Sequence, residues 1–360
     1  MTSTLRSRTV AAVVLLLSLP SAGAAATWVW PSFNCIQTLQ QCINSVAHGD
    51  IVEIASQGPI QESLQIEGKS LILRPYSGFL PVFAAPSIVV FGGSGVPGGT
   101  VQVTLQGLTF KSTRLILRQT GTDVFDVRVV DNTILDTSTS GNAIEVSSTN
   151  SLPFYGPVFF EVSRNRIHIR GTSTSTNLGA IAVGGFLSTA RGKIVGNTIL
   201  QTGIALQGEV IKVYGAERST TVDVIDNEIR GVFNAGIVLH QGGTGKLAAR
   251  VINNLVVGQD SIAGATGGLV VYGAGGSTNA LVVNNTVAGG HRGIQIYGGP
   301  GATLGGCVAA GLSGPRRAAA GALRDFVLGV KLIDGRGRAL GFGGQVMKNV
   351  AGYDVSRLVA

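Results

Sequence analysis

The sequence predicts an all-β fold in which short parallel strands stack into a solenoid. The first observation is an asparagine that closes a β-branched strand six times, at intervals of 27 to 33 residues. The recurring positions are Asn132, Asn165, Asn197, Asn227, Asn254 and Asn285. The second is a composition with 53 glycines in 360 residues, 44% hydrophobic and 13% charged residues, which indicates many turns and a large core. Short strands bury a face only when successive units stack. The asparagines should therefore form an internal ladder, bonded to one another and to the turn backbone.

Residues 1–26 have the pattern of a secretory signal. Arg6 and Arg8 precede the apolar run Val10 to Leu19, and small residues follow at Ala24 to Ala26. The run has ten residues, whereas a membrane span needs about 20. We therefore expect cleavage after Ala24 or Ala26, no transmembrane span, and a protein that is secreted, periplasmic or at the cell surface.

Residues 27–50 are predicted to cap the N-terminal end of the solenoid. Residues 31–47 have the pattern of a short amphipathic helix with Ile36, Leu39 and Ile43 on one side. Such a helix would cover the apolar cross-section that an open solenoid leaves exposed.

The three cysteines do not match a zinc site. Cys35 and Cys42 are seven residues apart, and within one helix their Cα atoms would be about 10 Å apart, too far for a disulfide. A bridge requires Cys35 to lie outside the helix, so a disulfide and two buried thiols both remain open. Cys307 has no local partner.

Residues 51–298 hold the repeat itself. Each asparagine strand is followed by a second short strand opened by a small residue: NAIEVSS, GAIAVGG, TGIALQG, AGIVLHQ, GGLVVYG and RGIQIYG. Upstream, VEIASQ, LQIEGKSLILRP and VQVTLQGLTF are less regular versions of the unit. Over about residues 33–298 this pattern resembles the right-handed parallel β-helix proteins of the pectate-lyase-like type. The resemblance implies a single-stranded right-handed parallel β-helix.

The repeat contains no recognisable catalytic or metal-binding group. Asp131 and Asp226 occupy the same repeat position but should lie about 14 Å apart, with Arg164 and Gly196 between them. Asp123 and Asp126 are expected on opposite faces of a strand.

The four histidines fall in four different units, where we expect turn or surface positions: His48, His168, His240 and His291. We therefore expect binding of a carbohydrate or another cell-surface polymer. A polysaccharide lyase or hydrolase with an unrecognised site is an alternative.

The charge distribution excludes nucleic acid as the expected partner. Residues 27–301 carry 17 Lys and Arg against 16 Asp and Glu, whereas residues 302–360 carry 8 against 3. A nearly neutral body lacks the basic surface that binds nucleic acid. No pattern specifies an oligomeric state or a particular ligand.

Residues 299–360 depart from the repeat. Residues 326–333 and 338–342, joined by the turn DGRG, have the pattern of a hairpin. The segments GATLGG, GLSGPRR, RDFVLGVKLIDG and GGQVMKNVAGYDVSRL occur in the order seen in the FAD-binding subunit of glycolate oxidase, a flavoprotein of the vanillyl-alcohol-oxidase type. The region is similar to a fragment of that family.

This second resemblance implies FAD as a cofactor and a 2-hydroxy-acid oxidoreductase subunit as an alternative function. The residues implied to line or approach the flavin are Ala302, Thr303, Gly305, Gly306, Gly311, Gly314 and Arg324. The glycine-rich loop that holds the FAD pyrophosphate in that family has no counterpart here, so we expect the truncated segment not to bind FAD. The simplest account is a fusion between an exported solenoid and part of an oxidase subunit, with the junction between Tyr297 and Thr303.

Overall fold

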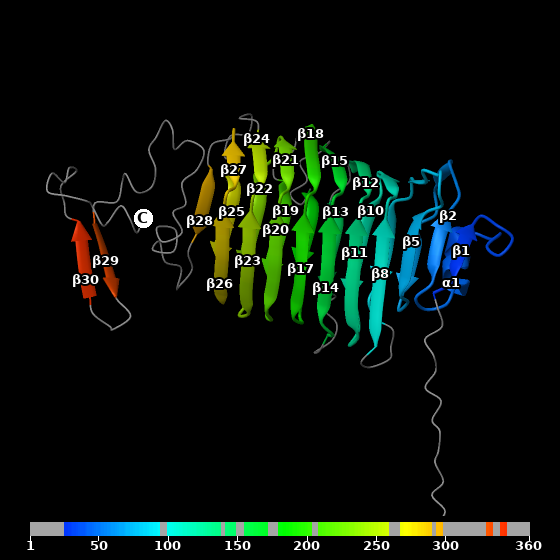
Figure 1. The fold of residues 1–360 in the computed structure, drawn as a ribbon, viewed down its shortest axis with the longest axis horizontal. Helices are drawn as coiled ribbons and strands as arrows, with labels where there is room; N and C mark the ends of the chain where they lie inside the picture. The colour runs from blue at the N-terminus through cyan, green and yellow to red at the C-terminus, as the bar shows by residue number, and fades with distance from the viewer. Residues whose placement is uncertain are drawn as a thin grey trace, which may run out of the picture.

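The computed structural model describes residues 25–93, 99–137, 141–148, 155–171, 179–203, 208–258, 267–289, 293–297, 329–333 and 339–343. Most of them form a parallel β-solenoid with three long sheets, whose strands lie side by side along the long axis (Figure 1). Within each sheet, a strand pairs in parallel with the equivalent strand of the next coil. The predicted stacking of equivalent strands is confirmed.

Each coil contributes one strand to each sheet. Sheet A contains β1 (Thr27–Trp30), β2 (Ile51–Ile54), β5 (Leu71–Pro75), β8 (Thr100–Gln106), β11 (Val124–Val130), β14 (Val158–Ser163), β17 (Ala190–Val195), β20 (Thr220–Ile225), β23 (Lys246–Ile252) and β26 (Ser277–Val283). Sheet B contains β3 (Pro59–Ile60), β6 (Val82–Phe83), β9 (Thr109–Lys111), β12 (Thr133–Thr137), β15 (Arg166–Gly171), β18 (Thr198–Gly203), β21 (Glu228–Gly231), β24 (Leu255–Gly258) and β27 (Thr286–Ala288). Sheet C contains β4 (Leu64–Glu67), β7 (Ser87–Phe91), β10 (Arg114–Gln119), β13 (Asn142–Ser148), β16 (Gly179–Gly184), β19 (Glu209–Gly215), β22 (Ala235–Gln241), β25 (Gly267–Gly273) and β28 (Ile294–Tyr297).

The asparagine motif is the corner between sheets A and B. The strand before each asparagine lies in sheet A, and the residues after it start a separate strand in sheet B, so a coil has three strands where the sequence pattern predicted two. Five of the six predicted second strands coincide with strands of sheet C; in the sixth, TGIALQG, Thr202 and Gly203 belong to β18 of sheet B, and residues 204–207 lie outside the described residues. In that coil the sheet C strand is β19, because its alternation places Ile211 and Val213 against the core, in register with Ile181 and Val183.

The interior is a continuous column of aliphatic side chains with a few stacked phenylalanines. Alternate residues of each strand point inward, as in β11, where Phe125, Val127 and Val129 are buried and Asp126 and Arg128 face outward. Phe83 and Phe110 stack in neighbouring coils of sheet B with ring centroids 5.3 Å apart. This burial of equivalent apolar residues in successive coils stabilises the stack.

The N-terminal end carries the one helix of the described chain, α1 (Leu39–Ser45). Leu39 and Ile43 join the core as predicted, but the helix is shorter than expected and Ile36 is 75% exposed. The helix starts after Thr38, whose hydroxyl accepts from the backbone N–H of Gln41 at 3.2 Å, so Ile36 precedes the helix and does not share its buried face.

A disulfide joins Cys35 and Cys42, with their Cα atoms 5.2 Å apart. Cys35 lies outside the helix, which is the condition that the sequence set for a bridge. Of the two open alternatives, the disulfide is therefore correct.

Residues of the first coil hold both ends of α1. The carboxylate of Glu62 accepts from the backbone N–H groups of Leu39 and Gln40, both at 3.1 Å. The ammonium of Lys69 donates to the carbonyls of Ile43, Asn44 and Val46 at 2.9, 2.8 and 2.6 Å. These contacts place an anion at the positive end and a cation at the negative end of the helix.

The strand before α1 is also attached to the first coil. β1 pairs in parallel with β2, and Asp50 accepts from the backbone N–H groups of Ala26 and Ala47 and from the indole of Trp28. Burial opposes ionisation of Asp50, but these hydrogen bonds outweigh it and hold the pKa of its carboxyl below the ordinary value.

In the C-terminal region, β29 (Gly329–Ile333) pairs antiparallel with β30 (Ala339–Gly343), which confirms the predicted hairpin. Residues 1–24 of the predicted signal (residues 1–26), Cys307 and the rest of the segment after Tyr297 lie outside the described residues. Within the described part of the chain, no helix is long and apolar enough to span a membrane.

Candidate functional site

The outer face of sheet C carries a column of aromatic side chains. In β19, β22, β25 and β28, the residues that alternate with the buried aliphatic ones point outward. Strand register aligns Tyr214, His240, Tyr272 and Tyr297 across four successive coils. The ring centroids are 5.5, 5.7 and 4.7 Å apart along the series, so the rings form one continuous column.

A glycine makes room for the first ring of the column. Gly184 occupies the same position in β16 as Tyr214 does in β19. A Cβ atom on Gly184 would lie 2.5 Å from the Cβ of Tyr214, and its φ of 147° is one that other residues rarely adopt. Because Gly184 has no side chain, the aromatic column begins at Tyr214 in the next coil.

Polar groups flank the aromatic column. The hydroxyl of Tyr214 donates to Glu209 at 3.0 Å, and the ammonium of Lys212 lies 3.6 Å from the same carboxylate. Burial and the nearby Glu209 raise the pKa of the Tyr214 phenol, so this hydroxyl stays protonated. Burial, with the nearby Tyr297 and Glu209, also raises the pKa of Tyr272.

The same face is ionic nearer the N-terminus. The carboxylate of Glu145 in β13 forms ion pairs with Arg114 and Arg118 of β10, whose guanidinium nitrogens lie 3.5 and 3.4 Å from its oxygens. Glu145 and Glu209 are thus both paired with cations, and Glu67 of β4 on the same face accepts from the side chain of Gln65. About 14 Å separates the backbone positions of Glu145 and Glu209, given two coils and three residues of offset. They are not arranged as a catalytic pair.

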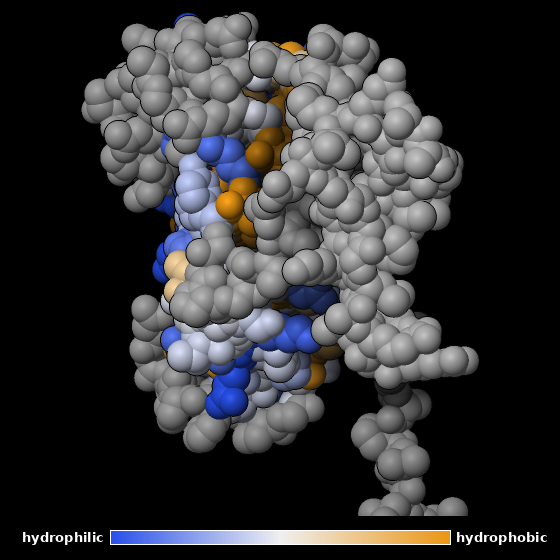
Figure 2. All heavy atoms as spheres, turned by 90° about the vertical axis from the view of Figure 1, so that its left-hand side faces the viewer, coloured by the Kyte–Doolittle hydropathy of each residue, from blue (hydrophilic) through white to orange (hydrophobic). Residues whose placement is uncertain are grey.

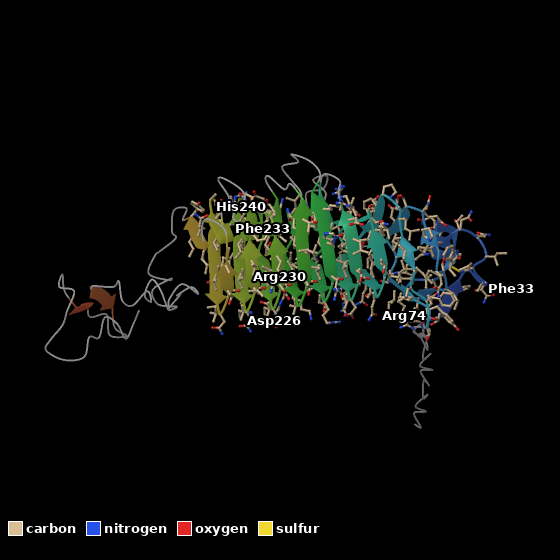
Figure 3. The ribbon with its side chains drawn as sticks, turned by 90° about the horizontal axis from the view of Figure 1, so that it is seen from above. Phe33, Arg74, Asp226, Arg230, Phe233 and His240 are labelled. Atoms are coloured by element: carbon tan, nitrogen blue, oxygen red, sulfur yellow. A yellow bond between two sulfur atoms is a disulfide. The ribbon has the colours of Figure 1, made fainter. Side chains whose placement is uncertain are left out.

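The aspartates singled out from the sequence lie elsewhere. Asp131 and Asp226 are in the corner between sheets A and B, and Asp131 is bound by Arg164, with Nε 2.7 Å from its Oδ1. Figure 3 shows Asp226 and His240 on opposite sides of the solenoid. Asp123 is buried just before β11, whereas Asp126 lies on the outer face of that strand, so the two point to different sides as predicted.

The histidines have separate environments. His48 accepts from the backbone N–H of Ser70, and His168 contacts Thr202 and Asp136 on sheet B. His240 is a surface residue, as expected, but belongs to the aromatic column; His291 lies outside the described residues. Among the described residues, no three His, Cys, Asp or Glu side chains are grouped to hold a metal ion.

The tyrosines of the column were missed by the sequence interpretation. Alignment of GGLVVYG with RGIQIYG places Tyr272 and Tyr297 at one position, and this signal could have identified them. Tyr214 was missed because the predicted second strand of its coil, TGIALQG, precedes β19. The residues proposed to approach FAD all lie outside the described residues: Ala302, Thr303, Gly305, Gly306, Gly311, Gly314 and Arg324.

The topology defines the class of the chain: a parallel β-solenoid whose described site is the outer face of one sheet. No protein-family model matches the chain, and no solved structure matches it. The chain is 66% identical over 55 residues to the glycolate oxidase subunit GlcE of Escherichia coli strain K12. The match covers 15% of this chain and 16% of that subunit, so the chain spans about one sixth of the length of this curated relative.

Proposed function

We propose that the solenoid binds an extended carbohydrate polymer along the outer face of sheet C. The observation that carries this proposal is the column of Tyr214, His240, Tyr272 and Tyr297. Aromatic side chains with polar tips combine apolar surface with hydrogen-bonding groups, which suits the mixed apolar and hydroxyl surface of a sugar. Four stacked positions extend over about 14 Å, a length that favours a chain of sugars over a single sugar.

Binding without catalysis is favoured by the state of the acidic groups. Glu145 is contacted by the side chains of Arg114, Arg118 and Ser147, and Glu209 by those of Lys212 and Tyr214. General acid–base cleavage of a glycosidic bond uses a pair of carboxyl groups that flank the bond. A lyase or hydrolase is therefore the weaker alternative, and its test is the release of unsaturated or reducing sugar ends.

We further infer that the solenoid is of the right-handed, pectate-lyase-like type and is exported. Right-handed crossovers are strongly preferred where a strand returns in parallel to the same sheet. The Cys35–Cys42 disulfide supports an oxidising compartment outside the cytosol, in agreement with the signal pattern of residues 1–26.

Affinity electrophoresis in gels that contain xylan, mannan, β-glucan or dextran tests the binding proposal. We expect at least one of these neutral polymers to retard the protein. Tyr272→Ala should lose the retardation, because it removes the central ring between His240 and Tyr297. The matched control is Tyr76→Ala, a 40% exposed tyrosine whose ring contacts Phe79 away from the column. The proposal would be overturned if both variants were retarded equally. It would also be overturned if no polymer retarded the unaltered protein.

The second candidate is an FAD-linked subunit that oxidises a 2-hydroxy acid, and the 55-residue similarity to GlcE favours it. We assign that similarity to residues 299–360, where the FAD-contacting residues would be Ala302, Thr303, Gly305, Gly306, Gly311, Gly314 and Arg324. Loss of several charge-assisted hydrogen bonds to the pyrophosphate, each of about 1.5 to 3 kcal/mol, would weaken even a tight site to millimolar affinity or worse. We therefore propose that the segment is a fused fragment without bound flavin.

Absorption spectroscopy separates the two candidates. The purified protein should be colourless, show no flavin band after incubation with FAD, and leave glycolate unoxidised. A stoichiometric yellow protein would favour the oxidoreductase and make Thr303, Gly305 and Gly306 the first residues to replace. Genomic sequencing across the codons for Tyr297 to Thr303 tests the junction directly.

A further inference from the structure

Strand β15 of sheet B presents two exposed arginines that have no ion-pair partner. Ile167 and Ile169 point into the core, so Arg166, His168 and Arg170 point outward from the same strand. Arg166 and Arg170 are both exposed. No described residue forms a hydrogen bond or ion pair with either guanidinium group.

This lack of partners is unusual for the strands of this solenoid. Six other arginines of the described strands each pair with a carboxylate: Arg74, Arg114, Arg118, Arg128, Arg230 and Arg250. Among the arginines of the described strands, Arg166, Arg170 and Arg191 have no such pair. Two of these three lie on one face of one strand. Six of the nine arginines in the described strands are neutralised by a carboxylate, so the two unpaired arginines of β15 give this strand a local excess of positive charge.

The neighbouring strands add little negative charge. Strand register places Thr133 and Thr198 beside Arg166, so hydroxyl groups flank this guanidinium. His168 contacts the hydroxyl of Thr202 at 2.9 Å and lies 3.5 Å from Asp136. The other described carboxylate on the outer face of sheet B, Glu228, is already bound by Arg230.

Lys111 of β9 adds a further exposed cation two coils away on the same sheet. We call Lys111, Arg166, His168 and Arg170 the sheet B strip. In Figure 3, which is seen from above, Arg230 marks this sheet between His240 of sheet C and Asp226 at the corner.

We propose that the sheet B strip binds an anionic polysaccharide through its charged groups. A guanidinium group donates parallel hydrogen bonds that match a carboxylate, sulfate or phosphate oxyanion. Arg166 and Arg170 are four residues apart in a strand, which separates their backbone positions by about 13 Å. A single small anion does not span that distance, whereas a polymer with repeated charges meets both arginines at once and gains from double attachment.

The remaining surface argues against nucleic acid as the polyanion. The solenoid region is nearly neutral, with 17 basic and 16 acidic residues between positions 27 and 301. Nucleic-acid-binding surfaces carry a broad basic footprint, and single strands also need aromatic side chains for base stacking. Among the described residues of sheet B, the exposed large hydrophobic side chain is that of Leu200, which provides no such stacking surface.

Binding of the full-length protein to dextran sulfate, measured by biolayer interferometry, tests the proposal, with neutral dextran as the uncharged reference. Arg166→Gln and Arg170→Gln should each weaken binding about tenfold, since each removes a charge-assisted hydrogen bond. Arg191→Gln is the matched control, because it removes an exposed, unpaired arginine from sheet A. All three side chains face solvent, so the fold should persist, and circular dichroism verifies this.

Each outcome decides the proposal. Loss confined to the two β15 variants, together with weaker binding at high salt, supports it. An equal loss in Arg191→Gln would show a response to total charge and overturn it, as would no binding to dextran sulfate. Tighter, Arg166-dependent binding to double-stranded DNA would overturn the polysaccharide assignment. This surface is separate from the sheet C face, so retardation by neutral polymers and its loss in Tyr272→Ala are independent of these results.

Discussion

Each ladder asparagine from Asn132 to Asn254 links its own coil to the coils on either side. Oδ1 of Asn197 accepts from the backbone N–H and the side-chain amide of Asn165 at 3.0 and 2.9 Å. Its Nδ2 donates to Oδ1 of Asn227 at 2.9 Å and to the carbonyl of Val162 at 2.9 Å. The same pattern runs from Asn132 to Asn285. Asparagine suits this corner because one short side chain supplies both a donor and an acceptor.

Replacement of Asn197 by Ala should lower the free energy of unfolding by about 1 to 3 kcal/mol. The donors of Asn165 and the carbonyl of Val162 would lose their buried partner. Asn285→Ala should cost less, because Asn285 is half-buried and its described ladder contact is with Asn254 alone. Urea denaturation of both variants measures the difference. Equal and negligible losses would mean that these amides do not stabilise the stack.

The residue before each ladder asparagine has a positive φ, and this backbone conformation produces the tight corner. Asp131, Arg164, Asp226, Asn253 and Asn284 have φ between 53° and 58°, and Gly196 has a φ of 65°. Left-handed backbone is favourable for glycine and tolerable for asparagine and aspartate, so arginine is the unusual residue in this series. Arg164 makes a two-point contact with Asp131 in the preceding coil, at 2.7 and 2.9 Å.

At the scale of the strands, the outer face of sheet A carries charges of alternating sign. Register places Arg128, Glu161, Lys193, Asp223 and Arg250 at one position in five successive coils. Lys193 lies 3.2 Å from Glu161, and Arg250 contacts both oxygens of Asp223 at 2.7 and 2.6 Å. Burial raises the pKa of Glu161, but its contacts with Ser163 and Lys193 lower it by more. Parallel stacking sets equivalent residues about 4.8 Å apart, so like charges would repel and alternation favours the native register.

Asp223→Lys should lower the midpoint of urea denaturation, because it places three cations in consecutive coils. High salt should recover part of this loss by screening the repulsion. The control is Ala248→Lys, which introduces the same side chain between the uncharged Thr221 and Asn279 on the same sheet. If the two variants have the same midpoint of urea denaturation at low salt, the alternating charges of sheet A do not stabilise the native register.

At the scale of the whole molecule, stability is built from contacts between successive coils. The three sheets pair each strand with its equivalents in adjacent coils, and α1 covers the N-terminal end. Figure 2 views the molecule from the end where β28 lies, and apolar side chains are visible there beside polar ones. Leu281, Ile296 and Tyr297 of this last coil are 44%, 42% and 40% exposed.

A chain of residues 27–298 should fold cooperatively and give a β-type circular dichroism spectrum, because the contacts that stabilise a solenoid are local to neighbouring coils. Thermal and urea unfolding followed by circular dichroism compare its cooperativity with that of the full-length chain. If residues 27–298 are insoluble while the longer chain behaves well, residues 299–360 are a true cap and the fusion hypothesis loses its main support.

The sequence by itself determined the solenoid class, the asparagine ladder, the helix at one end and the C-terminal hairpin. It could do so because parallel stacking repeats one chemical requirement at each coil, and Asn165, Asn197 and Asn227 show the same residue at the same corner. The third strand of each coil was not apparent from the sequence. The corner between sheets A and B at each ladder asparagine has only two residues, so the two strands that it joins have the sequence pattern of one longer strand.

Tertiary structure decided which side chains meet between coils. The Cys35–Cys42 bridge depends on where α1 begins. The Asp223–Arg250 pair and the column through Tyr214 and His240 depend on where each strand begins. Intervals of 27 to 33 residues between ladder positions leave that start undefined in the sequence. A shift of one residue turns every side chain of a strand to the opposite face. The core resolves this ambiguity, because Ile211 and Val213 must face inward and thereby place Tyr214 on the surface.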